Sequence, residues 1–297
     1  MMEKIIPPEL QIMKLNEYLI RHAHRLPSPV ITVGGQAVMY WYAYYLYAYQ
    51  HKPIVENITS VDVDYVTQKE TVKAIASIFN VEPNIQEHFT PPSIAILDLI
   101  DKNTGKVKKD SEGLFLDPRS NTANLIDIID RPTGFGPGDF SGKTLALNTE
   151  QFYVETDTEE LSSEKVLILS PIACIRSRLA NATAPMGKDK QTEAERIKAL
   201  AVPVFNYLLE KFRENDFKES RIYLDYFCEI IWKNQYRRYQ VTYGLPLYSI
   251  LEGLYQQLRD YPEGYIYPEA FLKQELPRKI AFYKKRYERI SELVNTD

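Results

Sequence analysis

Two aspartates separated by one residue are the first feature of the sequence that could do chemistry. The segment "ITSVDVDYV" occupies residues 58–66, and Asp62 and Asp64 interrupt a mostly apolar run. Side chains alternate along a strand, so both carboxylates project from one face. Two like charges this close repel each other, and folding alone would not select them. The pair predicts a positive partner, and Mg²⁺ is suitable because it prefers carboxylate, water and phosphate oxygens.

A pair of glycines precedes these acids along the chain. The segment "SPVITVGG" predicts a buried strand at Val30–Val33 that runs into Gly34 and Gly35, followed by a helix from Gln36 to about Gln50. Glycines at such a turn let a phosphate approach the backbone, and the N-terminus of the helix favours anions. Gly34 and Gly35 are therefore predicted to bind a nucleotide, beside carboxylates that hold a metal–triphosphate complex for attack on the α-phosphate.

Together, "VGGQAV" and "TSVDVDYV" resemble the signature of the polymerase-β-like nucleotidyltransferase superfamily, nearest to the AbiEii-type toxins and related uncharacterised bacterial nucleotidyltransferases. The resemblance covers residues 30–66 by motif and roughly 8–200 by the order of elements. It implies transfer of a nucleoside monophosphate from an NTP, such as ATP or GTP, to a hydroxyl acceptor with two Mg²⁺ ions. The acceptor class stays open between RNA, protein and a small molecule, and the role implied is that of the toxin in a toxin–antitoxin pair.

The family commonly uses a third carboxylate on a later strand. Asp127 in "NLIDIID" is the match by position, with Asp130 and Asp98 as alternatives. The resemblance implies that Asp62, Asp64 and Asp127 bind metal, and that Asp127 either binds the second ion or takes the proton of the acceptor hydroxyl. Ser60 is expected to hydrogen-bond a terminal phosphate or to cap the turn.

The sequence also departs from the family pattern. Between Gly35 and Asp62 lie 26 residues, more than in compact members. Arg176 and Arg178 stand where toxin-like members carry a lysine, and they are predicted to bind phosphate, because a guanidinium can do so through two hydrogen bonds. These departures leave an alternative open, in which the fold is catalytically inactive and serves as a binding, antitoxin-like or nucleotide-sensing module.

Periodicity and turn residues divide the chain near residue 170. We predict an α+β protein with a nucleotidyltransferase-like α/β domain at 1–170, a minimal mixed β-sheet flanked by helices, and an all-helical domain at 171–297. The predicted strands are 30–33, 58–66, 93–100, 113–118, 124–130, 144–147, 152–154 and 165–169. The predicted helices are 8–25, 36–50, 68–79, 171–183, 190–214, 217–236, 246–260 and 268–294.

Composition sets limits on the remaining function classes. The formal charge of −4 and the pI near 5.8 argue against coating of nucleic acid by bulk electrostatics. The two cysteines are far apart in apolar contexts, which indicates buried thiols in a reducing compartment. The N-terminus lacks the apolar core of a signal peptide, so we expect a soluble cytoplasmic protein with no membrane partner.

Three further segments have alternative interpretations. The loop "TGFGPGDFSG" lacks the spacing of a P-loop and is predicted to be a flexible loop. The aromatic run "MYWYAYYLYAY" is expected to pack in the core, although Tyr40 near its start could stack on a base. The run 233–239 mixes basic and aromatic residues, which suits RNA and equally suits the end of a surface helix.

Overall fold

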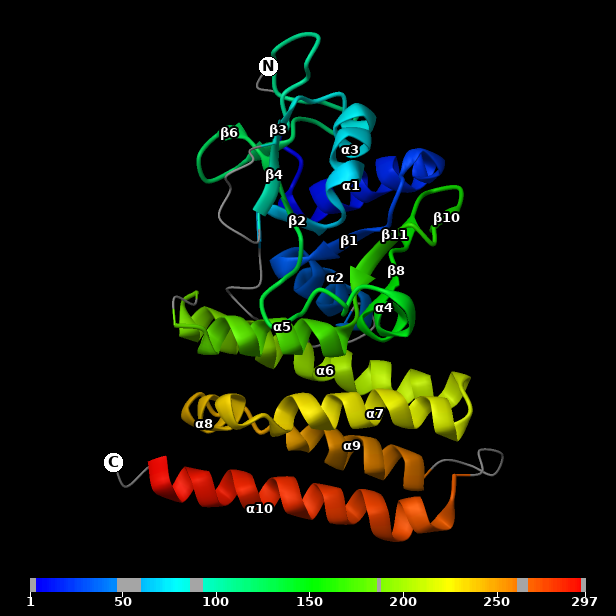
Figure 1. The fold of residues 1–297 in the computed structure, drawn as a ribbon, viewed down its shortest axis with the longest axis vertical. Helices are drawn as coiled ribbons and strands as arrows, with labels where there is room; N and C mark the ends of the chain where they lie inside the picture. Colours follow the sequence, from blue (N-terminus) through cyan, green and yellow to red (C-terminus); the bar gives the residue numbers. More distant parts are fainter. Residues whose placement is uncertain (1–3, 47–59, 86–92, 186–187, 261–266, 295–297) are drawn as a thin grey trace. The chain divides into compact units, whose positions relative to one another are not determined.

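A computed structural model of the protein describes residues 4–46, 60–85, 93–185, 188–260 and 267–294 (Figure 1). The chain forms two compact units. Unit 1 comprises Met1–Tyr40 and Ile58–Cys174, and unit 2 comprises Trp41–Asn57 and Ile175–Asp297. The predicted α+β class is confirmed. The observed units differ from a single division at residue 170, because unit 2 also takes in the segment that follows Tyr40.

Unit 1 is built on a mixed seven-stranded sheet with the order β3-β4-β7-β2-β1-β11-β8 (Figure 1). Strands β2 and β7 are parallel, as are β1 and β11, while the other neighbours are antiparallel. The seven strands are β1 Val30–Val33, β2 Val63–Val66, β3 Pro83–Ile85, β4 Ser93–Asp98, β7 Leu125–Ile129, β8 Thr149–Gln151 and β11 Val166–Leu169. Two small hairpins add β5 Leu116–Asp117 with β6 Thr122–Ala123, and β9 Val154–Glu155 with β10 Glu160–Leu161.

Two helices of unit 1 present apolar stripes that are buried in its core. Helix α1 (Pro8–Arg21) buries residues about one turn apart, and α3 (Val72–Phe79) does the same. Asn16 of α1 hydrogen-bonds Thr32 of β1 and the hydroxyl of Tyr65 in β2, at 3.1 and 3.2 Å. These contacts place α1 on the sheet face that carries Thr32 and Tyr65, so the side chains that alternate with them project from the opposite face.

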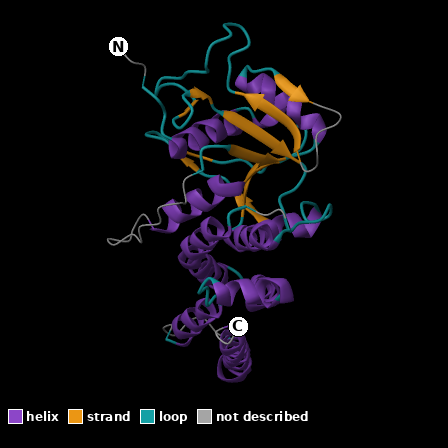
Figure 2. Ribbon diagram, turned by 90° about the vertical axis from the view of Figure 1, so that its left-hand side faces the viewer, coloured by secondary structure: helices purple, strands orange, loops and turns teal. Residues whose placement is uncertain are grey.

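Unit 2 contains helices and loops in its described part (Figure 2). Its helices are α5 Pro171–Thr183, which begins in unit 1, α6 Lys190–Glu214, α7 Phe217–Trp232, α8 Asn234–Thr242, α9 Tyr248–Arg259 and α10 Leu276–Val294, which follows a π-helical turn at Phe271–Glu275. Asp189 and Asp216 cap α6 and α7, where each carboxylate accepts a hydrogen bond from the backbone three residues on. Helix α2 (Gly34–Leu46) spans the boundary between the units at Tyr40.

Several predicted elements change type or length. Residues 144–147 were expected to form a strand but lie in helix α4 (Gly142–Asn148), where the Thr144 hydroxyl donates to the Ser141 carbonyl. The predicted helix 217–236 breaks at Lys233, whose extended ψ of 132° separates α7 from α8. Of the predicted strand 113–118 only Leu116–Asp117 is regular, and the short edge strand β3 was not predicted. The last four residues of the predicted helix 36–50 lie outside the described residues.

The remaining expectations concern the thiols and the membrane. Cys174 and Cys228 are both buried thiols, and burial raises the pKa of Cys228 to about 11. In the ranges that the structure describes, no helix combines the length and apolarity needed to cross a bilayer.

Candidate functional site

The site begins where strand β1 ends. Val33 is paired with Asp64 of β2, and Gly34 follows directly as the first residue of α2. Gly34 has a φ of +72°, a conformation that glycine adopts without steric cost. A Cβ atom at this position would lie 2.0 Å from Oδ2 of Asp64. The glycine is therefore required both for the backbone turn and for the space that the Asp64 carboxylate occupies.

Asp127 is the carboxylate that the fold places beside Asp64. The two residues are partners in the parallel pairing of β2 with β7, so their side chains project from the same sheet face. Both side chains are half-buried. The Ser93 hydroxyl of β4 donates a 2.7 Å hydrogen bond to Oδ1 of Asp127, which orients the carboxylate. The sheet thus holds two like charges side by side on neighbouring strands.

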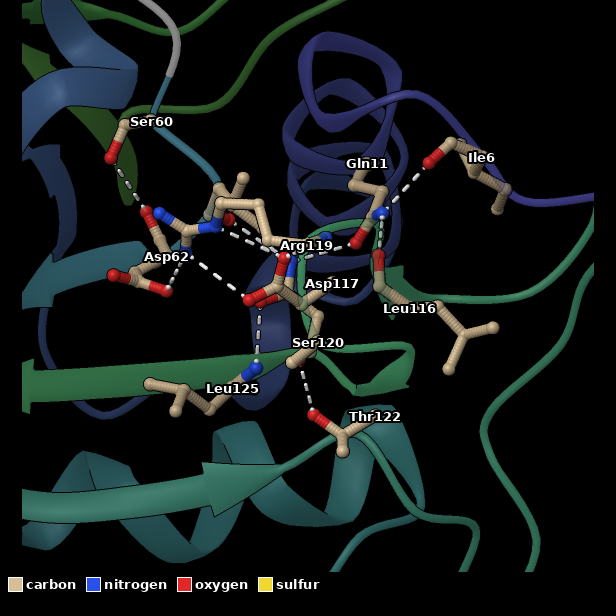
Figure 3. A network of polar contacts seen from close by, with 12 residues as sticks. Ile6, Gln11, Ser60, Asp62, Leu116, Asp117, Arg119, Ser120, Thr122 and Leu125 are labelled. Atoms are coloured by element: carbon tan, nitrogen blue, oxygen red, sulfur yellow. Dashed lines mark hydrogen bonds and ion pairs between the residues drawn. The ribbon is translucent and has the colours of Figure 1, made fainter.

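Asp62 lies just before β2 and reaches a different partner. Nη2 of Arg119 lies 3.3 Å from Oδ1 of Asp62 and 3.2 Å from Oδ2 of Asp117, so one guanidinium bridges two carboxylates (Figure 3). Hydrogen bonds from Arg119 hold the pKa of Asp117 below its usual range. The Arg119 and Asp62 side chains are 62% and 53% exposed, and exposed ion pairs contribute only about 0–1 kcal/mol. This pair can therefore open at little cost.

Buried amide side chains hold the segment that leads into β2. Nδ2 of Asn124 donates to the Val61 carbonyl at 3.0 Å and to Oε1 of Gln11 at 2.8 Å. Gln11 in turn donates to the carbonyls of Ile6 and Leu116 at 2.7 Å each (Figure 3). The Gln36 amide of α2 donates to the Ser60 and Val61 carbonyls. This network connects the backbone before Asp62 to the strand that carries Asp117.

The other predicted residues around the acids take ordinary structural positions. The Ser60 hydroxyl donates to the backbone carbonyl of Asp62 at 3.3 Å (Figure 3). This contact corresponds to the expected alternative in which Ser60 caps the turn. Gly35 is buried in the first turn of α2. Asp98 is exposed at the end of β4, and Asp130 pairs with its neighbour Arg131 at 3.2 Å. Of the three candidates for the third acid, only Asp127 is the register partner of Asp64.

Arg176 and Arg178 belong to unit 2 and have protein partners there. Arg178 is 3% exposed and forms an ion pair with the fully buried Glu193 at 3.3 Å. Arg176 donates to the Tyr226 hydroxyl at 3.1 Å. Burial of a guanidinium requires a carboxylate partner of this kind, so Arg178 has a structural role that explains its position. We do not include either arginine in the candidate site.

The aromatic helix and the glycine-rich loop also have structural explanations. Tyr40 is 9% exposed and its ring packs 4.5 Å from that of Phe152, so it is part of the core of unit 1. In the loop, the Gly136 amide donates to Oδ2 of Asp139 at 2.7 Å. This bond orders a turn of the loop predicted to be flexible.

The carboxylates offer the donor chemistry of a divalent-cation site. Their oxygen atoms are the hard donors that Mg²⁺ prefers, and the space left by Gly34 accommodates the Asp64 carboxylate. Across the described ranges, no group of three or more His, Cys, Asp or Glu side chains is arranged to hold a metal ion together. The donor type fits Mg²⁺, while Asp62 is engaged with Arg119 in this structure.

Sequence reasoning missed Arg119, Gln36 and Asn124. Arg119 follows Asp117 and Pro118 in a turn, and a basic residue in a turn is ordinarily a solvated surface residue. Gln36 and Asn124 lie in apolar segments, and an amide between buried positions is the one signal that could have revealed them, because it needs partners. Comparison of the chain with models of protein families, with curated proteins and with solved structures found no significant match.

Proposed function

We propose that the protein is a Mg²⁺-dependent nucleotidyltransferase that moves a nucleoside monophosphate from an NTP to a hydroxyl acceptor. The in-register pair of Asp64 and Asp127, with Gly34 against it, carries this proposal. Two carboxylates side by side on one sheet face repel each other unless a cation neutralises them, so folding alone does not explain them. The mixed sheet with a strand-to-helix turn at Gly34 agrees with the polymerase-β-like arrangement that the motif implies.

Each residue has a role that its position supports. Asp62, Asp64 and Asp127 would hold the metal, which when bound supplies positive charge against the phosphates. Gly34 brings the backbone amides at the start of α2 close to the carboxylates, where an NTP phosphate finds N–H donors. Oδ1 of Asp127 accepts from Ser93, and Oδ2 makes no hydrogen bond to the described residues, so it is available as a ligand or as a proton acceptor.

The proposed reaction is a single displacement at phosphorus. The acceptor hydroxyl gives its proton to a carboxylate, for which Asp127 is the candidate, and its oxygen attacks the α-phosphorus. The bond between that phosphorus and the oxygen bridging to the β-phosphate breaks, and pyrophosphate leaves. Arg119 is placed to neutralise Asp62 before substrate binds, and the weakness of this exposed pair lets the carboxylate exchange partners.

The test is transfer of label from NTPs. We expect label from α-³²P-ATP or α-³²P-GTP, but not from γ-³²P-ATP, to appear on an acceptor in total RNA, in a protein lysate or on an aminoglycoside. Asp64→Asn and Asp127→Asn should reduce the rate at least about 100-fold, because each removes a metal ligand, and EDTA should abolish it. Asp98→Asn is the matched control on the adjacent strand and should retain activity.

The acceptor that is labelled identifies the substrate class. If expression of the wild-type protein arrests growth and the Asp64→Asn variant does not, the toxin-like role is supported as well. Label transfer that persists in Asp64→Asn would contradict the assignment of the active site.

The second candidate is a fold without catalysis that binds a nucleotide or a partner. The engagement of Asp62 with Arg119 favours it, because a resting ion pair at this position does not need a metal. Binding of an NTP without label transfer to any acceptor, unchanged in Asp127→Asn, would select this candidate instead.

A further inference from the structure

Unit 2 contains a second place where like charges converge, and this one is positive. A hollow opens to solvent among α7, α8, α9 and α10. Figure 1 shows α9 between α7 and the C-terminal helix α10, with α8 beside the end of α7. The residues that line the hollow include Trp232, Arg237, Tyr248, Tyr283, Arg286 and Tyr287. None of these residues belongs to the site of unit 1.

Two guanidinium groups gather on one indole ring in this hollow. Cζ of Arg237 lies 4.4 Å from the centre of the Trp232 ring, and Cζ of Arg286 lies 5.6 Å from it. Neither arginine forms an ion pair with a carboxylate in the described parts of the chain. Burial, and then the charge of Arg286, lower the pKa of Arg237. The ring attracts both cations but does not cancel their charge.

Two acids on the helices around the hollow are paired with lysines. Glu252 of α9 accepts from Lys284 at 3.2 Å, and Asp225 of α7 pairs with Lys279. Among the described residues, no carboxylate lines the hollow. An anion that enters therefore meets two arginines without carboxylate partners and no opposing charge from the lining.

Beside the arginines, the lining combines aromatic rings with Ile231, Gln240, Val241 and Ile290. The rings of Tyr248 and Tyr287 form an edge-to-face pair with centres 5.5 Å apart. Burial raises the pKa of Tyr287, so its phenol stays protonated near neutral pH and can donate a hydrogen bond. Tyr283 donates to the Cys228 carbonyl at 3.2 Å, which fixes one wall. The hollow thus combines flat apolar surfaces with converging donors.

We propose that this hollow binds an organic phosphate that carries an aromatic ring, such as a nucleoside monophosphate. A phosphate monoester carries nearly two negative charges, which match the two guanidinium groups, and arginine binds it through two hydrogen bonds. A planar base adds contact with the aromatic side chains.

Tryptophan fluorescence can report this binding directly. The protein has two tryptophans, and Trp41 is buried at 4% exposure whereas Trp232 lines the hollow. The titrations use the full chain with the Asp64→Asn substitution in EDTA, so that a metal–nucleotide complex at the site of unit 1 cannot contribute. The ligands are AMP, adenosine, inorganic phosphate and a 5′-phosphorylated oligoadenylate.

We expect AMP to quench the fluorescence saturably and to bind at least about tenfold more tightly than adenosine or inorganic phosphate. Arg237→Gln and Arg286→Gln should each weaken AMP binding about tenfold or more. Arg289→Gln is the control, because it removes the same charge from α10 without touching the hollow. Circular dichroism checks that every variant is folded.

The outcomes separate the two sources of such a ligand. Tighter binding of the oligonucleotide than of AMP would assign the site to the 5′ end of a nucleic-acid strand, and the reverse would assign it to a free nucleotide. Equal binding of adenosine and AMP, or equal loss in Arg289→Gln, would overturn the proposal. Because these titrations need neither Mg²⁺ nor an intact Asp64, their result is independent of whether the protein transfers nucleotides.

Discussion

An oxygen of the Asp64 carboxylate occupies the volume that a side chain on residue 34 would need. Any L-residue there must adopt a positive φ and also displace this carboxylate. Both demands originate from the same turn, in which β1 ends and α2 begins. At the scale of single residues, glycine is therefore required at position 34 as long as the Asp64 carboxylate holds this place.

Gly34→Ala tests this coupling, with Gly105→Ala as its matched control. Gly105 also has a positive φ, of +66°, but a Cβ atom there would meet nothing within 4 Å. We expect Gly105→Ala to lower the free energy of unfolding by about 1 kcal/mol, for the backbone alone. Gly34→Ala should cost a further ~1–3 kcal/mol, because the new methyl group overlaps the Asp64 carboxylate. Urea denaturation measures both, and equal losses would contradict the close approach.

At the scale of elements, a hydrogen bond between Tyr45 and Glu210 connects α2 to α6 within unit 2. The Tyr45 hydroxyl of α2 donates a 2.6 Å hydrogen bond to Oε2 of Glu210 in α6. Burial raises the pKa of Glu210 above its usual 4.5, while the bond from Tyr45 acts in the opposite direction. A raised pKa in the folded state means that folding favours the protonated acid, so this group costs stability as pH rises through its folded pKa.

Glu210→Gln should therefore be more stable than the wild type near neutral pH. Glutamine keeps an acceptor for Tyr45 and cannot ionise, so the gain should fade as pH falls toward 4.5 and below. The gain is expected to be under ~1 kcal/mol, since the side chain is only half-buried. Tyr45→Phe should do the reverse and destabilise more at pH 7 than at pH 4. Thermal melts across this pH range measure both, and a pH-independent difference would contradict the assignment.

At the scale of the whole molecule, two helices, α2 and α5, contribute residues to both units. Tyr40 of α2 packs on Phe152 in unit 1, whereas Trp41 packs 6.5 Å from the Tyr207 ring in unit 2. Unit 2 is therefore assembled from segments that are distant in the sequence. A cut at residue 174 would separate the C-terminal helices from the aromatic residues that α2 contributes.

We predict that the isolated fragment 175–297 is less stable than the same region in the full chain. It loses the Trp41–Tyr207 contact and leaves Glu210 without the Tyr45 hydroxyl. Trp232 is the sole tryptophan of the fragment, and in the Trp41→Phe variant of the full chain it reports on the same unit. Its fluorescence should show a lower melting temperature for the fragment. Identical melting temperatures would show that α2 adds nothing to unit 2.

Short-range patterns determined much of this protein. The helical pattern of apolar residues predicts helices at 171–183 and 190–214, which the structure confirms at those bounds. These features depend on neighbours in the sequence, so the sequence is sufficient to predict them. Of the two acids in "VDVDYV", only Asp64 lies in strand β2. The segment 144–147 was ambiguous, because a short alternating run also fits an exposed helical turn.

Only the tertiary structure decided which charges meet. The parallel pairing of β2 with β7 makes Asp127, rather than Asp98 or Asp130, the neighbour of Asp64. Local periodicity in the sequence does not determine the order of strands in a sheet. The same holds for Arg119 beside Asp62 and for Arg178, which packing buries against Glu193. The sequence by itself thus determined the chemistry that is available on each element. Long-range packing decided how that chemistry is combined, because contacts between distant segments depend on the whole fold.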